Sequence, residues 1–462
     1  MRAIIEGFPS KWQIDIVKEL DVEPVYWCCN DLGLSEYLPE KCLFHSAENM
    51  ISGIIPNNIL EIFGTNGNIE YISDDILRAD ADQIDAITRI IRIRKDLYGK
   101  ALAFDEGALR RFVYKQISFW MTVIDKTSPE VVLFEAAPHL VHHYALYYAA
   151  RKKGIRTVIV NRVGEPIRFF LAERIEELIP DKIVNEPAFV DKVIPIRQKP
   201  KYATEGPSAT ASEGVSLKKI IFNLNRLWRI QSYRFVFGRI KNVAYKIPYN
   251  IIYRFLSIDT IPKNKFVYFP LHESPEDTTY PGGWNFEDQV YAIEYLSQIL
   301  PEDVNIVVKE HQNQRFWRGR NLAFYPNINK LRNVSLISKN TDSFKLIDKS
   351  IAVATITGQA GWEAITNSKP VIYFGQAWYK GVPGSVYINE FKAMTLEARK
   401  DFLNTQSFSE LQAWYISFYK RSFPGYVNHI MTGSELPNIS HITMCINKYL
   451  SNEKVENIDF PF

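Results

Sequence analysis

The stretch that most constrains the fold of this chain is IAVATITGQAGWEAITNSKPVIYFG, residues 351–375. It contains an apolar run at Ile351–Ile356, a turn with two glycines, a helical run at Trp362–Thr366 and a second apolar run at Val371–Phe374. Short apolar runs bounded by glycine and proline are typical of buried strands. The stretch therefore predicts a strand, a glycine turn, a helix and a second strand, which together form one βαβ unit of an α/β fold.

The glycine turn of this unit is a candidate anion site. Free N–H groups and the helix dipole favour an anion such as phosphate at the start of a helix. Glu363 follows one turn later, where its carboxylate can accept hydrogen bonds from sugar hydroxyls. The dinucleotide-binding pattern G-x-G-x-x-G is absent. The alternative is that the two glycines only permit a tight turn and close packing of the helix on the strand. The turn consists of Thr357, Gly358, Gln359, Ala360 and Gly361.

Three further strands are predicted in the same half of the chain, and each ends in a polar loop. The predicted strands are Phe266–Leu271, Val304–Val308 and Val334–Ser338, and the loops read HESPEDTT, KEHQNQ and SKN. Ligands of open α/β sheets bind beyond the carboxyl ends of the strands. We therefore expect Lys309 and His311 to contact the same phosphate as the glycine turn. A solvent-exposed strand end is the alternative.

The first half of the chain shows a similar pattern around the strand Val131–Phe134. Glu135 follows this strand directly, and His139 precedes a predicted helix at Leu140–Lys153. Both residues lie where chemistry is expected in an open α/β sheet. A metal site is a further possibility here, because His139, His142 and His143 share one helix face. The sequence offers no nearby cysteine or clear carboxylate to complete the site, so we expect packing or hydrogen-bonded histidines and no metal.

The middle of the chain separates the two halves. Residues 195–213 have linker composition, and no acidic residue occurs between Glu213 and Asp259 while Lys and Arg alternate there with aromatic residues. This pattern favours a helical segment that contacts an anionic membrane surface or an acidic polymer. A solvated helical hairpin is the alternative. No nucleic-acid-binding signature accompanies the segment, so we expect no nucleic-acid partner.

Composition narrows the class of protein further. The formal net charge of +3 is too small to imply nucleic-acid binding by itself. The 4 cysteines include no C-x-x-C pair, which favours a reducing compartment. The first residues lack the apolar core of a signal peptide, and no apolar stretch is long enough to span a bilayer. We expect a cytoplasmic protein.

Four stretches together resemble a known family. They are FPLHESPEDTT, VVKEH, TGQAGWEAITNSKPVIYFGQAWY and FEAAPHLVHHYALYYAARKKGIRT. They are similar to the GT-B glycosyltransferases of bacterial capsule polysaccharide biosynthesis, in particular to the branch that contains the β-Kdo transferases. The resemblance implies a GT-B-like α/β fold with two Rossmann-like domains facing across a cleft. It also implies a CMP-activated sugar donor in the second half and an acceptor in the first. Gln312 departs from the family, which more often has proline there.

We accordingly expect four segments. They are an acceptor domain at 1–190, a linker and basic aromatic helical segment at 191–260, a nucleotide-sugar domain at 261–390, and C-terminal helices at 391–462. The predicted function is transfer of a sugar, such as Kdo or a related ulosonic acid, to a glycan or glycolipid acceptor of a capsule or O-antigen. The protein would contact the inner membrane peripherally. Alternatives are a UDP- or GDP-sugar transferase, a sugar-nucleotide epimerase, and a non-catalytic nucleotide-binding subunit.

The chemistry of transfer requires a carboxylate opposite the donor phosphate. Such a group stabilises the oxocarbenium-like sugar, accepts the acceptor's proton or attacks the sugar as a nucleophile. Glu135 is the first candidate, followed by Glu276 and Glu165, with His139 nearby. A CMP donor has one phosphate and the sequence has no D-x-D motif, so we expect no obligatory metal cofactor.

Overall fold

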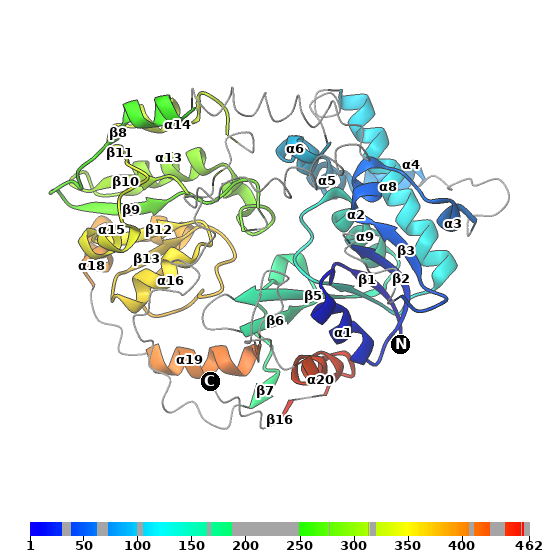
Figure 1. The fold of residues 1–462 in the computed structure, drawn as a ribbon. Coiled ribbons are helices and arrows are strands. Elements are labelled where there is room, and N and C mark those ends of the chain that lie inside the picture. Colours follow the sequence, from blue (N-terminus) through cyan, green and yellow to red (C-terminus); the bar gives the residue numbers. More distant parts are fainter. Residues whose placement is uncertain are drawn as a thin grey trace, which may run out of the picture.

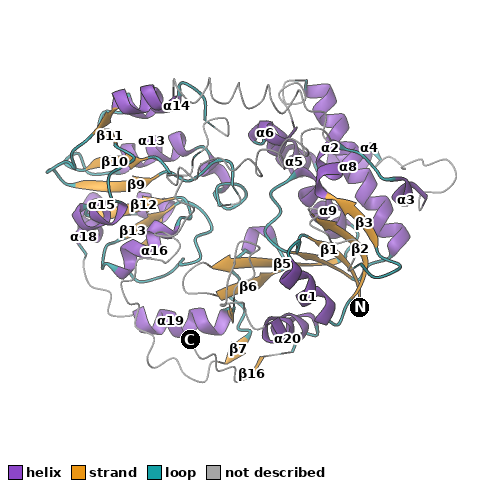
Figure 2. Cartoon of the chain, viewed as in Figure 1, coloured by secondary structure: helices purple, strands orange, loops and turns teal. Residues whose placement is uncertain are grey.

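In the described part of the chain, the strands form two seven-stranded sheets and one two-stranded sheet (Figures 1 and 2). The computed structural model describes residues 1–29, 38–61, 73–98, 105–163, 168–186, 249–276, 278–312, 314, 320–405, 411–425, 439–453 and 455–456. Each large sheet has its own core and helices, so the chain folds as two α/β halves and not around one continuous sheet. This arrangement confirms the predicted fold class.

The first sheet has the strand order β15-β6-β5-β4-β1-β2-β3. Strands β1 to β5 are parallel, and β6 and β15 extend the sheet with antiparallel pairs. The chain first builds outward from β1 and then crosses to β4, which makes the crevice between β1 and β4 the switch point where ligands bind in such sheets. The strands are β1 (Arg2–Glu6), β2 (Glu23–Cys29), β3 (Leu43–Ser46), β4 (Val131–Phe134), β5 (Arg156–Val163), β6 (Arg168–Ala172) and β15 (Phe423–Pro424).

Helices cover both faces of this sheet. One face packs against α5, α8 and α9, and the other packs against α1 and the C-terminal α20. Helices α5 and α6 are separated at Arg94, which has non-helical backbone angles. The helices are α1 (Lys11–Glu19), α2 (Ala47–Ser52), α3 (Asn57–Leu60), α4 (Asp74–Ala79), α5 (Ala81–Ile93), α6 (Lys95–Tyr98), α8 (Glu106–Thr127), α9 (Val141–Lys152) and the 3₁₀ turn η3 (Ile175–Glu177).

The second sheet has the strand order β14-β13-β12-β9-β10-β11-β8, and all its pairs are parallel. Its switch point lies between β9 and β12. The unit predicted from residues 351–375 is confirmed as β12–α16–β13. The strands are β8 (Ser257–Ile258), β9 (Phe266–Pro270), β10 (Asn305–Lys309), β11 (Val334–Ile337), β12 (Ala352–Thr355), β13 (Val371–Tyr373) and β14 (Ser385–Tyr387). The helices are η4 (Trp284–Glu287), α13 (Gln289–Ile299), α14 (Phe324–Asn329), α15 (Ser343–Lys349), α16 (Gln359–Thr366), α17 (Ile388–Ala393) and α18 (Leu396–Asn404).

The core of the second half begins before residue 261, where the sequence placed its start. Residues 249–256 are helical, and Tyr249 and Tyr253 are buried in the core of the second sheet. These two aromatic side chains therefore pack inside the protein and are not available to a surface. The predicted linker and the basic segment up to residue 248 lie outside the described residues.

The C-terminal elements connect the two halves (Figure 1). On α19 (Leu411–Arg421), Trp414 and Phe418 belong to a hydrophobic cluster that also contains Phe170 of the first half and Trp362 of the second. Further on, α20 (Ile439–Leu450) packs against the first half, and β16 (Val455–Glu456) pairs with β7 (Asn185–Glu186). The sequence predicted helices here but not where they dock. Among the described residues, no helix combines the length and the apolar character that a bilayer crossing needs.

Candidate functional site

At the switch point of the second sheet, His272 links the end of β9 to the end of β12. Its Nε2 lies 3.0 Å from Thr355 Oγ1 and 3.4 Å from the backbone nitrogen of Thr357. The side chain is 8% exposed, and burial lowers its pKa to about 3, so the ring is neutral. His272 is the first residue of the polar loop HESPEDTT, from which only Glu276 was predicted as a site residue.

The two glycines of the turn have packing roles. A Cβ at Gly358 would lie 2.9 Å from Thr355 Oγ1 and 3.0 Å from the His272 ring. A Cβ at Gly361 would lie 2.1 Å from the Tyr379 hydroxyl oxygen, far inside van der Waals contact. The packing alternative raised by the sequence therefore applies to both positions, and it does not remove the helix N-terminus as a binding feature.

The start of α16 still offers backbone donors. Gly358 is its N-cap, and the first N–H groups of any helix lack intrahelical acceptors. Thr357, Gln359, Ala360 and Glu363 are all half-buried, so this end of the helix is partly open. Thr357 also donates its hydroxyl to the Thr278 carbonyl at 2.8 Å, which ties the turn to the loop after β9.

The KEH residues at the end of β10 have different environments. Lys309 is 4% exposed and its Nζ donates to Ser343 Oγ at 2.7 Å; burial lowers its pKa to about 8. His311 is half-buried, and burial also lowers its pKa. Glu310 is fully buried and pairs with Arg320, whose Nη2 lies 3.1 Å from its Oε1. Glu310 therefore anchors the end of β10, while its two neighbours, Lys309 and His311, lie at the carboxyl edge of the second sheet.

His311 and Glu363 do not come from neighbouring strands of the second sheet. His311 follows β10 and Glu363 lies on α16 after β12, and β9 lies between these two strands. Trp378 and Tyr379, in the loop after β13, are buried. Tyr379 is 0% exposed, and the Trp378 ring centroid lies 4.5 Å from that of Trp362 in the hydrophobic cluster that joins the halves.

In the first half, Glu135 holds the turn that follows β1. It is 9% exposed, and its carboxylate accepts hydrogen bonds from the Phe8 N–H and from Gln13 Nε2, both at 2.9 Å. Arg162 Nη1 lies 3.7 Å from the same carboxylate. Gly7, with φ +88°, is so close that a Cβ there would lie 2.5 Å from Glu135 Cβ. The structure thus gives Glu135 a structural role, and its catalytic role stays a prediction.

A small pocket between the halves brings two of the predicted catalytic residues together. It is lined by Ile90, Ile93, Arg94 and His139 from the first half and by Pro275, Glu276 and Tyr280 from the second. Glu135 is not among these lining residues. His139 is oriented by its Nδ1, which lies 2.9 Å from the Ala137 carbonyl. Glu165, the third candidate carboxylate, lies outside the described residues.

Contacts beside this pocket hold the halves together. The Tyr280 hydroxyl donates to the Ala86 carbonyl at 2.8 Å, and Arg89 pairs with Glu287 at 2.5 Å. At a second place, the Gln376 side chain accepts from the Leu178 N–H at 2.9 Å and donates to the Ile175 carbonyl at 2.7 Å. Direct hydrogen bonds and an ion pair therefore join the two halves, and one of the bonds comes from Tyr280, which lines the pocket.

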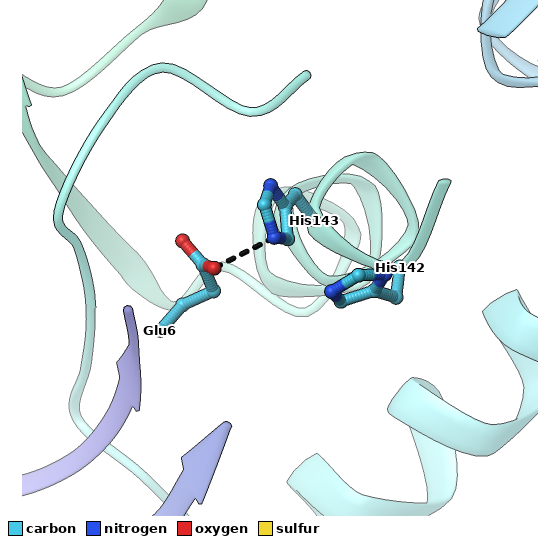
Figure 3. A group of neighbouring side chains, drawn as sticks. All are labelled: Glu6, His142 and His143. Carbon is cyan, nitrogen blue, oxygen red and sulfur yellow. Dashed lines mark ion pairs between the residues drawn. The ribbon is translucent and has the colours of Figure 1, made fainter. Parts of the chain in front are cut away.

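Beneath the crevice of the first sheet lies a buried cluster of Glu6, His142 and His143 (Figure 3). Glu6 Oε1 lies 2.7 Å from His143 Nε2. Burial, and next the nearby Glu135, raise the pKa of Glu6 to about 8, while burial lowers the pKa of both histidines well below the usual value. The expectation that no carboxylate lies near these histidines is therefore wrong. Glu6 ends β1 and is far from them in the sequence, so its position could not be read from the local pattern.

The two sheets with their covering helices define an α/β protein with two Rossmann-like halves. A model of the family described as "Capsule polysaccharide biosynthesis protein" matches residues 293–386, which run from α13 to β14 and include the KEH residues and the glycine turn. Over this part the chain resembles the capsule polysaccharide biosynthesis family, as the sequence motifs predicted. No curated protein sequence matches the chain.

Several solved structures are similar to the chain at low identity. The β-Kdo 2,7 transferase KpsC of Thermosulfurimonas dismutans is 15% identical, with 58% of this chain and 72% of that one covered and a TM-score of 0.30. S. aureus MnaA with UDP is 14% identical, with 99% and 100% covered and a TM-score of 0.29. Anabaena HepE with UDP and glucose is 13% identical, with 97% and 99% covered and a TM-score of 0.31.

Proposed function

We propose that this protein is a nucleotide-sugar-dependent glycosyltransferase of bacterial surface polysaccharide biosynthesis. One observation carries the proposal. The family match coincides with the carboxyl edge of the second sheet, where Lys309, His311 and the start of α16 flank the switch point. This edge combines a cation, an imidazole and free backbone donors, the groups that bind phosphate.

The donor would bind with its phosphate at this edge. Lys309 supplies a charge, His311 an N–H and the start of α16 backbone N–H groups, while Glu363 accepts hydrogen bonds from the ribose hydroxyls. As the bond between the anomeric carbon and the phosphate oxygen breaks, negative charge develops on the phosphate. Preorganised donors stabilise that charge. No obligatory metal cofactor is needed for this step.

The acceptor would approach from the first half through the pocket between His139 and Glu276. Its hydroxyl oxygen forms the new bond to the anomeric carbon, and its proton passes to a carboxylate, for which Glu135 and Glu276 are the candidates. We favour a CMP-linked donor of Kdo or a related ulosonic acid and a glycan or glycolipid acceptor of a capsule or O-antigen. This choice rests on the family resemblance.

The test is nucleotide release with matched donors. The purified chain is incubated with CMP-Kdo, UDP-sugars and GDP-sugars, with and without capsule-type oligosaccharide. We expect CMP release that depends on the acceptor, that is lost in Lys309→Met, and that persists in the control Lys349→Met at the far end of α15. If nucleotide is released only from a UDP- or GDP-sugar, that sugar nucleotide is the donor and the CMP-linked donor is wrong. Isomerised UDP-sugar would indicate an epimerase, and tight binding without turnover a non-catalytic subunit.

The basic segment between residues 213 and 259 supports a further part of the proposal, namely a cytoplasmic protein held peripherally at the inner membrane. Each Lys or Arg near an anionic leaflet contributes about 1 kcal/mol of binding free energy. Liposome co-sedimentation at low and high salt tests this. Binding to anionic vesicles that survives changing Arg226, Arg229, Arg234 and Arg239 to Ser would contradict it.

A further inference from the structure

We propose that Glu6, His142 and His143 bind a divalent transition-metal ion, with Zn²⁺ as the best fit, in the interior of the first half. The three side chains come from two elements, the end of β1 and the first turn of α9. One ligand atom from each lies within 4.8 Å of the others. The inference concerns the first half alone and is independent of the proposed donor site.

The histidines of this cluster have unsatisfied nitrogen atoms. His142 is 1% exposed and His143 is 7% exposed. Among the described residues, neither ring nitrogen of His142 has a hydrogen-bond partner, and Nδ1 of His143 has none either. Buried polar atoms without partners are rare in folded proteins, and an unobserved water or ion is a usual explanation. In Figure 3, a ring nitrogen of His142 faces the Glu6–His143 pair.

The ligand chemistry favours zinc over the alkaline-earth ions. Two imidazole nitrogens and one carboxylate oxygen form a catalytic-type zinc set that leaves one position for water. Calcium and magnesium prefer oxygen ligands. On metal binding, the proton between Glu6 Oε1 and His143 Nε2 leaves to solvent. These two atoms then bond to the metal. Glu6 and His143 are 2.7 Å apart in the structure, so they must separate slightly to admit the ion.

The site lies in a position where a metal affects the rest of the first half. Glu6 ends β1 at the switch point, and the ring centroids of His143 and His139 lie 5.1 Å apart. Because His139 lines the pocket between the halves, a bound ion would lie one helical turn from that pocket. It would tie β1 to α9 and fix the start of α9, which His139 directly precedes.

Metal content is the direct test. The full chain is purified, stripped with a chelator, reloaded with Zn²⁺ and dialysed, and its metal is measured by elemental analysis. We expect one Zn²⁺ per chain in the wild type and loss of that metal in Glu6→Gln and in His142→Asn. Glu130→Gln is the matched control. Glu130 directly precedes β4 of the same sheet, and within the described part of the chain its carboxylate accepts a hydrogen bond only from the exposed Arg2 N–H. It should retain the metal.

A second measurement does not depend on variants that fold poorly. The melting temperature of the stripped wild type should rise on titration with Zn²⁺ and stay constant with Mg²⁺, since a ligand of the folded state stabilises it by mass action. Co²⁺ loading should give the visible absorption bands of a low-symmetry site. The proposal is overturned if the stripped wild type takes up no Zn²⁺. It is also overturned if folded Glu6→Gln binds Zn²⁺ as tightly as the wild type does.

Discussion

The two switch points of this molecule have the same topology but opposite chemistry. In the first sheet, the crevice between β1 and β4 is lined with acidic and imidazole groups, of which Glu6 and Glu135 are buried close together. In the second sheet, the crevice between β9 and β12 contains the neutral His272, with Lys309 on the next strand and a helix N-terminus opposite. Topology thus determines where a ligand meets each sheet. The side chains at the strand ends determine which charge a ligand at that place should carry. The first crevice suits a proton acceptor or a cation, and the second suits an anion.

The largest expected effect tests the acidic crevice. Glu135→Gln should lower glycosyl transfer by about 10²–10⁴-fold, the usual contribution of a positioned acid–base group. CMP affinity should stay nearly unchanged, because we propose that the donor binds to the other half. The oxygen of the new glutamine can still accept the bond from the Phe8 N–H. Its amide nitrogen would face Gln13 Nε2, because Gln13 Oε1 already accepts from Ser10, so the melting temperature of the variant is measured beside its turnover. Turnover and CMP calorimetry are the measurements. Wild-type turnover would leave Glu135 structural and make Glu276 the candidate.

The second prediction tests the anion-binding crevice. His311→Ala and Glu363→Ala should each weaken CMP binding by about 1.5–3 kcal/mol, the value of a hydrogen bond to a charged partner. Gln312→Ala is the matched control, because Gln312 is exposed and adjacent to His311 in the sequence. Calorimetric titration with CMP measures all three. The same CMP affinity in both folded variants and in the control would remove this edge as the nucleotide site.

A third prediction separates the packing role of the glycine turn from its binding role. Gly361→Ala should destabilise the protein by about 1–3 kcal/mol, the range for overpacking, because the new methyl would overlap the Tyr379 hydroxyl. Tyr379→Phe in the same chain removes that oxygen and should restore part of the loss. Urea unfolding measures both. If Gly361→Ala unfolds at the wild-type urea concentration, close packing does not explain this glycine.

Much of this molecule could be predicted from local sequence. The βαβ unit of residues 351–375 is readable because its strands are apolar and its turn contains glycine, and Val131–Phe134 matches β4 residue for residue. Pairings between distant residues could not be predicted. Glu6 meets His143 only because β1 lies beside β4, and Trp378 is buried only because α19 returns from the C-terminal part. His272 was missed for a similar reason, since its partner Thr355 ends a strand on the far side of the switch point.

The smallest expected effect is a pH dependence that only the second crevice should show. Burial lowers the pKa of Lys309 to about 8, so in the free protein its ammonium group loses its positive charge as the pH rises through 8. A phosphate bound to Lys309 would keep the ammonium group protonated. Binding then requires proton uptake, and CMP affinity should fall by about tenfold between pH 7 and pH 9. The phosphate of CMP has its second pKa near 6 and adds little in this range. The pKa of His311 is already lowered, so its ring stays neutral throughout.

Lys309→Met should bind CMP weakly and with a flat profile over the same pH range. A wild-type profile as flat as that of Lys309→Met would show that Lys309 does not contact the phosphate, and the binding would then depend on His311 and the start of α16 alone.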